Sequence, residues 1–356
     1  MKRTTATAVS VVLGSCLLAA CGTDGGGGSD GGGSVTLVTH QSFEVSKDVL
    51  DAFTEKSGVK VRVLRADDAG AAVNQAILSK GNPQGDVFFG VDNALLSKAL
   101  GAGIFTPHKA EGLSEIPRQL QLDAEKNRVT PIDHGDVCVN YDRAYFERKK
   151  LAPPKTLDDL VKPEYKDMLV VQNAATSSPG LAFLLASVGA YGEDGWQDYW
   201  KKLKANGVAM VDGWEQAYND RFTGSASGRA KGDRPLVVSY ASSPPAEVHY
   251  GEDKKPAKAP TGVSTGTCFR QIEFAGLLEG AKNPEGGKAL LDFLAGEEFQ
   301  KDLPLNMWVH PARADVELPE VFTRYGAEIE KPHAVAPEDI EANREQWVKQ
   351  WASLMR

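Results

Sequence analysis

The stretch that decides the fold is MLVVQNAATSSPGLAFLLAS, residues 168–187. It opens with an apolar run, residues 168–171, that suits a buried strand, and residues 181–185 close it with the spacing of one helix face. Between them, Pro179 is a residue favoured in the first turn of a helix, and Ser177 is a common helix cap. The stretch therefore predicts a strand, a turn and a helix.

The start of this helix is a candidate binding element. The first turn of a helix has unpaired N–H groups and a partial positive charge, so it can hold an anion or a ligand oxygen. The hydroxyls of Ser177 and Ser178 add donors that rotate to suit. Because serine is also an ordinary helix cap, this stretch alone leaves both interpretations open.

Length and composition describe an ordinary soluble globular chain. Its 356 residues are enough for about two domains, with 42% hydrophobic and 25% charged residues. The formal net charge of −8 argues against a nucleic-acid-binding protein, which would normally present a basic surface.

The N-terminus has the features of an export signal. Lys2 and Arg3 precede an apolar segment, residues 9–20, that is too short to span a bilayer. The sequence Leu-Ala-Ala-Cys that ends at Cys21 resembles the lipobox of bacterial lipoproteins, in which the cysteine is lipidated. We therefore predict a signal peptide at residues 1–20, then lipidated Cys21 and a flexible Gly-rich tether to residue 34. The alternative is a plain signal peptide in which Cys21 is incidental.

The first part of the folded chain alternates strands and helices. Strands are predicted at 35–39, 59–63 and 86–90, with helices at 45–56, 71–79 and 95–100. This alternation indicates βαβ units and a mainly parallel sheet, whose ligands bind beyond the carboxyl ends of the strands. The polar residues just past those ends are His40, Gln41, Ser42, Asp67, Asp68, Asp92 and Asn93. Each of them would also fit a helix cap or a solvated loop.

The second part predicts further strands at 129–141, 208–211 and 235–239, and helices at 197–203 and at the C-terminus. Residues 267–277 read as a strand that passes into a helical run. Residues 224–233 read as an exposed polar loop.

Catalytic and metal-binding motifs are absent from the sequence. There is no G-x-S-x-G, H-E-x-x-H, Walker A or G-x-G-x-x-G pattern, so we expect neither an enzyme nor a bound cofactor. No Cys/His spacing indicates a metal site. Cys138 and Cys268 remain in the folded part, where an extracytoplasmic location would let them pair.

A binding constellation fits the sequence better. Trp214 and Tyr240 follow predicted strands, and Trp308 follows a helix predicted at 298–303. Aromatic faces stack on flat rings and attract cations. Each ring alone would suit core packing, but together with the hydroxyl pairs 177–178 and 242–243 the rings favour a ligand site.

Several stretches carry a family resemblance. They are DVFFGVDN (86–93), GVDNALL (90–96), TSSPGLAFLL (176–185), GWEQAY (213–218), SYASSP (239–244), GGKALLDFLAGEEFQ (286–300), MWVHP (307–311) and EANREQWVKQW (341–351). With the lipoprotein start, they make the chain similar to the extracytoplasmic solute-binding proteins of ABC importers, and most closely to the thiamine-binding members. The resemblance covers nearly all of residues 35–356.

The resemblance implies an α/β, two-lobe fold of the periplasmic-binding-protein type II, with a ligand cleft between lobes joined by crossing strands. We place lobe 1 at 35–142, completed by about 264–304, and lobe 2 at 143–263, completed by about 305–356. It also implies an extracytoplasmic, lipid-anchored monomer that delivers thiamine or its phosphates to the permease of an ABC importer. The two folded-part cysteines lie on the stretches it places at the lobe crossing, so we expect a Cys138–Cys268 disulfide.

The resemblance further implies which positions contact thiamine. They are Asp68, Ala69, Ser177, Ser178, Trp214, Tyr240, Ala241, Ser242 and Ser243, with Trp308 closing the same pocket. The aromatic residues would take the ligand's rings, Asp68 its positive charge, and the helix start at 177–178 its hydroxyl or phosphate.

Two departures from the family pattern concern this pocket. Family members often have Tyr-Asp in the first strand loop, where this chain has His40 and Gln41, so one carboxylate for the cation is missing. A second family tyrosine, shortly after residues 239–244, is Ala246 or a neighbour here. The resemblance therefore predicts a less aromatic cage and leaves the ligand preference open.

Two other readings stay open at this stage. One is a related receptor for a polyamine or ferric ion, although iron would usually need adjacent tyrosines and only Tyr240 is present in that region. A polyamine would need several carboxylates, for which Asp68, Asp92 and Asp136 are the candidates. The other is a secreted enzyme that acts on thiamine, with Cys138 or Cys268 as the nucleophile.

Overall fold

A mixed sheet of ten strands organises the part of the chain that the computed structural model describes, residues 33–226 and 232–356. The predicted signal peptide, Cys21 and nearly all of the predicted tether lie outside the described residues, as do residues 227–231 of the polar loop predicted at 224–233. The strands are β1 (Ser34–Thr39), β2 (Lys60–Arg65), β3 (Val87–Asp92), β4 (Phe105–Thr106), β5 (Thr130–Asp142), β6 (Leu169–Gln172), β7 (Ala209–Val211), β8 (Leu236–Tyr240), β9 (Thr261–Leu278) and β10 (His310–Pro311).

Helices cover this sheet. The α-helices are α1 (Lys47–Ser57), α2 (Ala69–Leu78), α3 (Leu96–Ala102), α4 (Arg143–Lys149), α5 (Ser178–Ala205), α6 (Ser243–Tyr250), α7 (Pro284–Leu294), α8 (Glu297–Asn306), α9 (Glu320–Tyr325) and α10 (Pro337–Met355). A short π-helix occupies Gln216–Arg221, and 3₁₀ turns occupy Leu113–Glu115, Arg118–Leu120, Asp159–Val161 and Pro163–Tyr165. None of the described helices combines the length and the apolar character that crossing a membrane would require.

The strand order is β2-β1-β3-β9-β5-β8-β6-β7, with β4 on β9 and β10 on β5. The outer strands pair in parallel, as the alternating pattern predicts, because α1, α2 and α5 supply the crossovers. The middle of the sheet differs from the mainly parallel prediction, since β9 pairs antiparallel with both β3 and β5. The helical run predicted to follow residue 267 is wrong, because pairing on both sides keeps β9 extended to Leu278.

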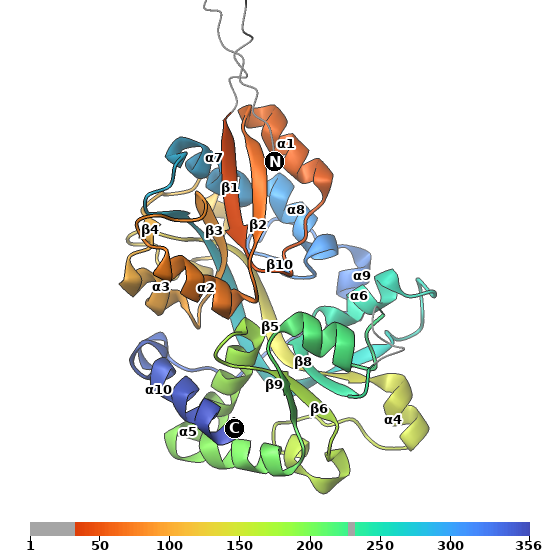
Figure 1. Ribbon diagram of the computed structural model, residues 1–356. Coiled ribbons are helices and arrows are strands. Elements are labelled where there is room, and N and C mark those ends of the chain that lie inside the picture. The colour runs from red at the N-terminus through yellow and green to blue at the C-terminus, as the bar shows by residue number, and fades with distance from the viewer. Residues whose placement is uncertain (1–32, 227–231) are drawn as a thin grey trace, which may run out of the picture. The chain divides into compact units, whose positions relative to one another are not determined.

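Two groups of elements stand at the ends of this sheet (Figure 1). We call β1, β2 and β3, with α1, α2, α3, α7 and α8, the first lobe; β6, β7 and β8, with α4, α5 and α6, form the second lobe. The long strands β5 and β9 run from one lobe into the other. A disulfide joins Cys138 on β5 to Cys268 on β9, with 4.2 Å between their Cα atoms. The two-lobe α/β architecture predicted from the sequence is confirmed.

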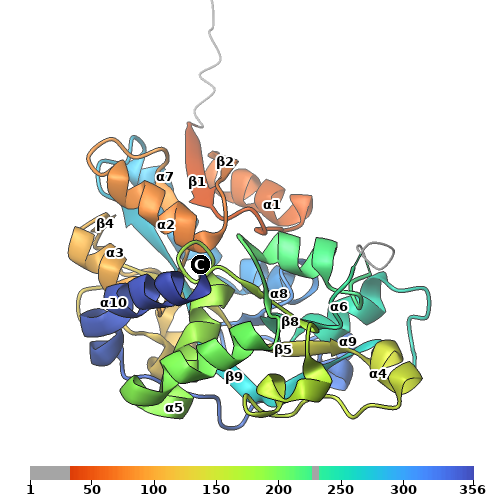
Figure 2. The ribbon, with the colours of Figure 1, turned by 60° about the horizontal axis from the view of Figure 1, so that its bottom comes forward.

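The strand, turn and helix predicted from residues 168–187 are β6 and α5. Residues 181–186 of α5 are fully buried, so this helix forms much of the second lobe's core. The helix predicted at 197–203 is the C-terminal part of α5. Helical geometry is interrupted at Gly192, whose φ of 67° suits glycine, and it resumes after that residue. Helix α10 packs along α5, as both ribbon views show (Figure 2).

Candidate functional site

A cavity of about 560 Å³ lies between the two lobes and draws its lining from both. The segment after β1 and the start of α2 line it from the first lobe, and the segment after α8 lies beside them. The starts of α5 and α6 and the π-helix line it from the second lobe. Such a position, beyond the carboxyl ends of strands, is where α/β sheets bind ligands.

Aromatic rings line this cavity from several elements. They are Trp214, Tyr218, Tyr240, Tyr250 and Trp308. The Trp214 and Tyr218 rings are stacked, with centroids 4.9 Å apart, and the indole N–H of Trp214 donates to the Ser239 hydroxyl at 2.9 Å. Trp214 is only half-buried, so one part of its ring is fixed by these contacts while another part faces the cavity. Flat or cationic ligand groups would find a preformed surface here.

Trp308 lines the cavity and has a strained backbone conformation. Its φ is 59°, a left-handed value that is uncommon for a residue other than glycine. The surrounding contacts hold it there: the Ser242 hydroxyl donates to its carbonyl at 2.6 Å, and its ring stacks on Phe322, with centroids 6.1 Å apart. Strained residues of this kind gather at functional sites, where the neighbouring structure fixes them.

Asp68 connects the two lobes. It precedes α2, but its carboxylate accepts hydrogen bonds from the other lobe: from the backbone N–H of Trp214 at 2.9 Å, and from the N–H of Ser178 and the hydroxyl of Ser177, both at 3.2 Å. Burial raises the pKa of Asp68, and these donors act in the opposite direction. The negative charge therefore sits at the positive end of α5.

The Ser178 side chain continues this connection. Its hydroxyl donates to Asp92, which ends β3, and it accepts a hydrogen bond from the Gln271 amide at 3.2 Å. Asp92 also accepts the N–H groups of Ala94 and Leu95, but burial dominates and raises its pKa to about 7. The hydroxyls of Ser177 and Ser178, at the start of α5, thus both donate to carboxyl groups of the first lobe.

The lining is acidic. Its carboxyl groups are Glu44, Asp68, Glu215, Glu247 and Glu273, and no lysine or arginine is among the described residues that line it. Glu215 accepts the Ser42 hydroxyl at 2.9 Å, and Glu247 accepts the Tyr218 hydroxyl at 2.9 Å. Such a cavity favours positively charged ligands. In residues 33–226 and 232–356, no three His, Cys, Asp or Glu side chains are arranged to hold a metal ion.

The structure brings most of the predicted contact residues together. Those that line the cavity are Asp68, Ala69, Ser178, Trp214, Tyr240, Ser243 and Trp308. Ser177, Ala241 and Ser242 lie behind this lining: Ser177 bonds Asp68, Ser242 holds Trp308, and Ala241 packs beside the disulfide. Asp136, a candidate polyamine ligand, is instead paired with Arg270 at 2.6 Å.

Several lining residues are not predicted from the sequence. Tyr250 lies four residues beyond Ala246 on α6, and both face the cavity, so one helical turn restores a ring that seemed to be missing. Glu273 lies on β9, where Gln271 and Glu273 alternate with apolar Ile272 and Phe274. That alternation was the available signal for an inward-facing polar pair.

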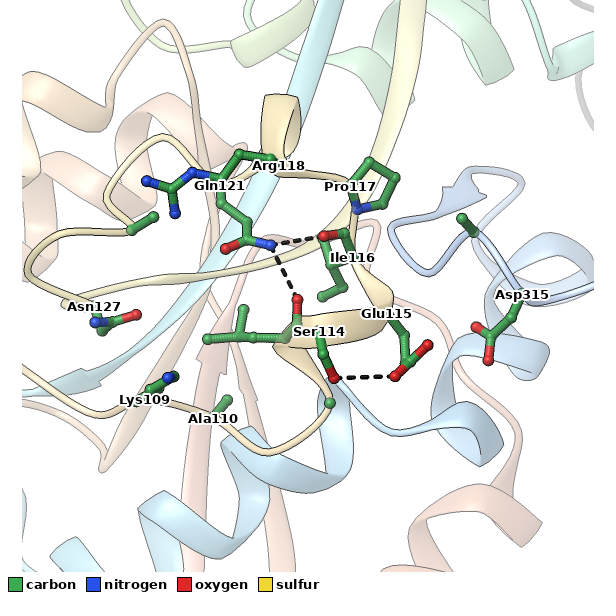
Figure 3. A pocket seen from close by; sticks show the side chains of 14 residues that line it. Lys109, Ala110, Ser114, Glu115, Ile116, Pro117, Arg118, Gln121, Asn127 and Asp315 are labelled. Carbon is green, nitrogen blue, oxygen red and sulfur yellow. Dashed lines mark hydrogen bonds between the residues drawn. The ribbon is translucent and has the colours of Figure 1, made fainter.

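A second and larger hollow, of about 890 Å³, lies on the first lobe. Figure 3 shows its lining, which comes mainly from residues 109–127 and includes Lys109, Glu115 and Arg118. The Gln121 amide there donates to the carbonyls of Leu113 and Ile116 at 3.0 and 2.6 Å, and these two hydrogen bonds stabilise the loop of residues 109–127. This hollow has no aromatic ring and a mixture of charges, and it does not resemble a site for a flat cation.

Comparison with known proteins agrees with this geometry. The chain is 29% identical over 324 residues to the thiamine-binding periplasmic protein of Salmonella typhimurium, which covers 89% of this chain and 92% of that one. The corresponding Brucella suis protein is 29% identical over 325 residues, covering 89% and 91%. A solved periplasmic thiamin binding protein superposes with a TM-score of 0.78 at 26% identity, covering 91% and 96%.

A more distant structure shows the same fold. The periplasmic binding protein AfuA of Actinobacillus pleuropneumoniae, with fructose-6-phosphate bound, has a TM-score of 0.74 at 16% identity and covers 91% of this chain and 98% of its own. The family model for bacterial extracellular solute-binding proteins matches residues 82–324. The family consists of binding proteins rather than enzymes, and this chain, with its cavity between two lobes, belongs to the bacterial extracellular solute-binding proteins.

Proposed function

We propose that the protein captures thiamine outside the cytoplasm and delivers it to an ABC importer. The observation that carries this proposal is the lining of the cavity, in which five aromatic rings and five carboxyl groups meet with no described lysine or arginine. Thiamine combines a flat aminopyrimidine with a permanently cationic thiazolium ring. Stacking and cation–π attraction, worth ~0.5–2 kcal/mol for each ring contact, match both parts.

The relatives support this ligand. Proteins described as thiamine-binding match this chain at 28–30% identity, five of them in Salmonella, Escherichia and Brucella species over 89% of its length. The positions that the resemblance implies as contacts include Trp214, Tyr240 and Ser243, which line the cavity. We propose that these rings hold the ligand's rings and that Trp308 closes the cavity over them.

The start of α5 supports a proposal about the form of the ligand. Its N–H and hydroxyl donors at Ser177 and Ser178 already bond Asp68 and Asp92. A phosphate placed there would meet two carboxyl groups, and like charges repel. We therefore propose that the unphosphorylated alcohol binds more tightly than its phosphate esters, which competition titration with thiamine monophosphate will test.

We also propose that the protein is a monomer attached to the membrane through lipidated Cys21. The proposal rests on the lipobox-like sequence after the apolar segment, residues 9–20, and on the Gly-rich stretch that follows it. Stable anchoring needs more than one acyl chain. A Cys21→Ala variant is expected to leave the membrane fraction of cells, and a variant that stays there at the wild-type level would contradict the anchor.

The proposed function is tested by the ligand itself. Untagged protein purified from cells is denatured, and the released small molecules are identified by mass spectrometry. Thiamine in near-stoichiometric amount, together with calorimetric binding of added thiamine to ligand-free protein, is the expected result. A different released ligand, or no heat with thiamine, would refute the proposal.

A polyamine is the second candidate, because the same five carboxyl groups would suit an aliphatic polycation. Such a ligand would use the charges but gain little from the stacked Trp214 and Tyr218 rings. Titration with spermidine separates the two: binding tighter than that of thiamine would favour the polyamine.

A further inference from the structure

Three acidic residues stand side by side on adjacent strands below the cavity. In the register of the sheet, Asp92 on β3 lies opposite Glu273 on β9, and Glu273 lies opposite Asp133 on β5. Directly opposite residues project on the same face of a sheet, and like charges in such pairs are destabilising. We call these three residues the acidic row. Glu273 is its only member that lines the cavity.

The charge of Glu273 has no cation to balance it among the described residues. The side chain is 8% exposed, and no lysine or arginine forms an ion pair with it. Its hydrogen-bond partners are the amide of Gln271, which donates at 3.2 Å, and the carboxyl group of Asp133. Asp92, by contrast, lies near the Arg344 guanidinium and bonds Ser178. Glu273 is therefore the member of the row whose negative charge a ligand in the cavity can balance.

The nearest basic group is His40, and it is also without a partner. Its Nε2 lies 4.0 Å from the nearer Glu273 carboxyl oxygen and makes no hydrogen bond, although the residue is only 9% exposed. Burial and the Arg65 charge lower the pKa of His40 to about 4, so it is neutral near pH 7. The ring is wedged against Gly90, where an added Cβ would lie 2.6 Å from its Cδ2 atom. A fixed, unpartnered ring nitrogen in a cavity wall marks a place for a ligand.

We propose that Glu273 is the counter-ion for the positive charge of the bound ligand, with His40 Nε2 as the adjacent polar contact. This inference rests on the proposed function and names the residue that selects a cation. The nitrogen of a thiazolium ring is quaternary and has no proton to lose near neutral pH, so burying the ring requires a nearby negative group. Asp68, the carboxylate expected from the sequence to meet this charge, is instead occupied by three donors of the second lobe.

Proton release is a consequence of this assignment. Burial, together with Asp133, Asp92 and Asp68, raises the pKa of Glu273 well above its usual value. The other titratable groups around it are His40, which is neutral, and Tyr240, whose pKa is also raised by burial. A cation placed beside Glu273 favours its ionised form, so the proton leaves for the buffer when the ligand binds.

The test compares two ligands of similar shape and different charge. Thiamine and thiothiamine, its neutral thiazolethione analogue, are titrated by calorimetry into wild-type protein and Glu273→Gln. The variant is expected to lose about tenfold or more in thiamine affinity, as close charge pairs do, and less than about twofold for thiothiamine. Glu279→Gln is the matched control, since Glu279 lies just past the end of the same strand and is exposed. It is expected to bind both ligands as the wild type does.

A second measurement separates charge recognition from a structural role. Titrations at pH 7 in buffers of different ionisation enthalpy report protons released, and we expect release on thiamine binding in wild type but not in Glu273→Gln. Equal loss of both ligands in the variant, or unchanged thiamine affinity, would overturn the inference while leaving the proposed function intact. Failure of the wild type to bind thiamine would overturn the proposed function itself.

Discussion

The two sides of the cavity treat their carboxylates in opposite ways. Where α2 meets α5, Asp68 accepts three hydrogen bonds from the other lobe and neutralises a helix start. On the β9 side, Glu273 stands between two further acidic residues and has no cation in the described chain. A carboxylate in a cavity wall can therefore hold the two lobes together or bind the charge of the ligand. The hydrogen-bond donors around the carboxylate show which of these two roles it has.

The largest expected effect concerns the closed junction on the Asp68 side. A Cβ added at Gly70 would lie 2.7 Å from the Thr176 carbonyl oxygen, where Ala71 N–H already bonds that oxygen at 3.0 Å. Both partners are backbone, so neither can yield, and Gly70→Ala should hold the lobes apart. We expect a loss of ~3 kcal/mol, about 100-fold, in thiamine affinity measured by calorimetry.

Gly101→Ala is the matched control for this change. Gly101 also lies within a helix, α3, but an added Cβ there meets no atom within 4 Å. It should leave affinity unchanged and slightly raise thermal stability, because alanine favours helix. If the two variants bind thiamine equally well, the close junction of α2 and α5 is not part of binding.

The next effect sharpens the role of the rings. Trp214→Ala removes the ring that is stacked on Tyr218 and faces the cavity, and it should weaken thiamine by ~1–3 kcal/mol. Trp214→Phe should recover part of that loss, because a ring face remains. Thiamine should also quench the tryptophan fluorescence of wild type more than that of Trp214→Phe. Reduced thermal stability with undiminished affinity would instead make Trp214 a packing residue.

The acidic row predicts how stability changes with pH in ligand-free protein. Burial raises the pKa of both Asp92 and Asp133 to about 7, so between about pH 4 and pH 7 the folded state binds more protons than the unfolded state. The contribution of these two carboxyl groups to the free energy of unfolding should therefore fall as pH rises through this range. We expect a fall of less than ~1.4 kcal/mol per pH unit, because the pKa shifts are shared within the row and other titrating groups change the stability in the opposite direction. Urea unfolding at pH 5 and 7.5 measures it.

Asp133→Asn is the control for this dependence. Asp133 lies beside Glu273 but does not itself line the cavity, and its replacement should flatten the fall in stability between the two pH values. Added thiamine should stabilise the wild type more at pH 7.5 than at pH 5. A steeper fall in the variant than in the wild type would contradict the assignment.

The smallest expected effect belongs to the larger hollow of Figure 3. Arg118→Ala changes the lining of a hollow that shares no lining residue with the cavity, and exposed substitutions usually alter stability by less than ~0.5 kcal/mol. We expect no change in thiamine affinity by calorimetry. A clear loss would show that this hollow takes part in ligand capture.

What the sequence predicts and what it misses have separate physical causes. Trp214 follows β7 and Tyr240 is the last residue of β8, and strand ends meet at one edge of a sheet, so local pattern suffices to place them at the cavity. The alternation around Glu273 indicates a polar face of β9, but the acidic neighbours of Glu273 depend on the register of β9 against β3 and β5, partners more than 100 residues away. Tyr250 depends on the rotation of α6 about its axis.

The role of Asp68 shows the same limit. The sequence places it after a strand and beside a helix start, and a carboxylate there is a fair candidate for the ligand's charge. Its donors come from residues 177, 178 and 214, in the other lobe, and only the folded chain brings them to it.

The contrast between the two carboxylates is tested most directly by the ratio of the thiothiamine and thiamine dissociation constants in Asp68→Asn. The amide that replaces the carboxylate cannot accept all three donors, so closure weakens and both ligands should lose affinity by a similar factor. We therefore predict that the ratio stays at its wild-type value while both constants rise. A ratio that collapses toward one, with thiamine alone weakened, would show that Asp68 meets the ligand's charge and would contradict the division of roles drawn here.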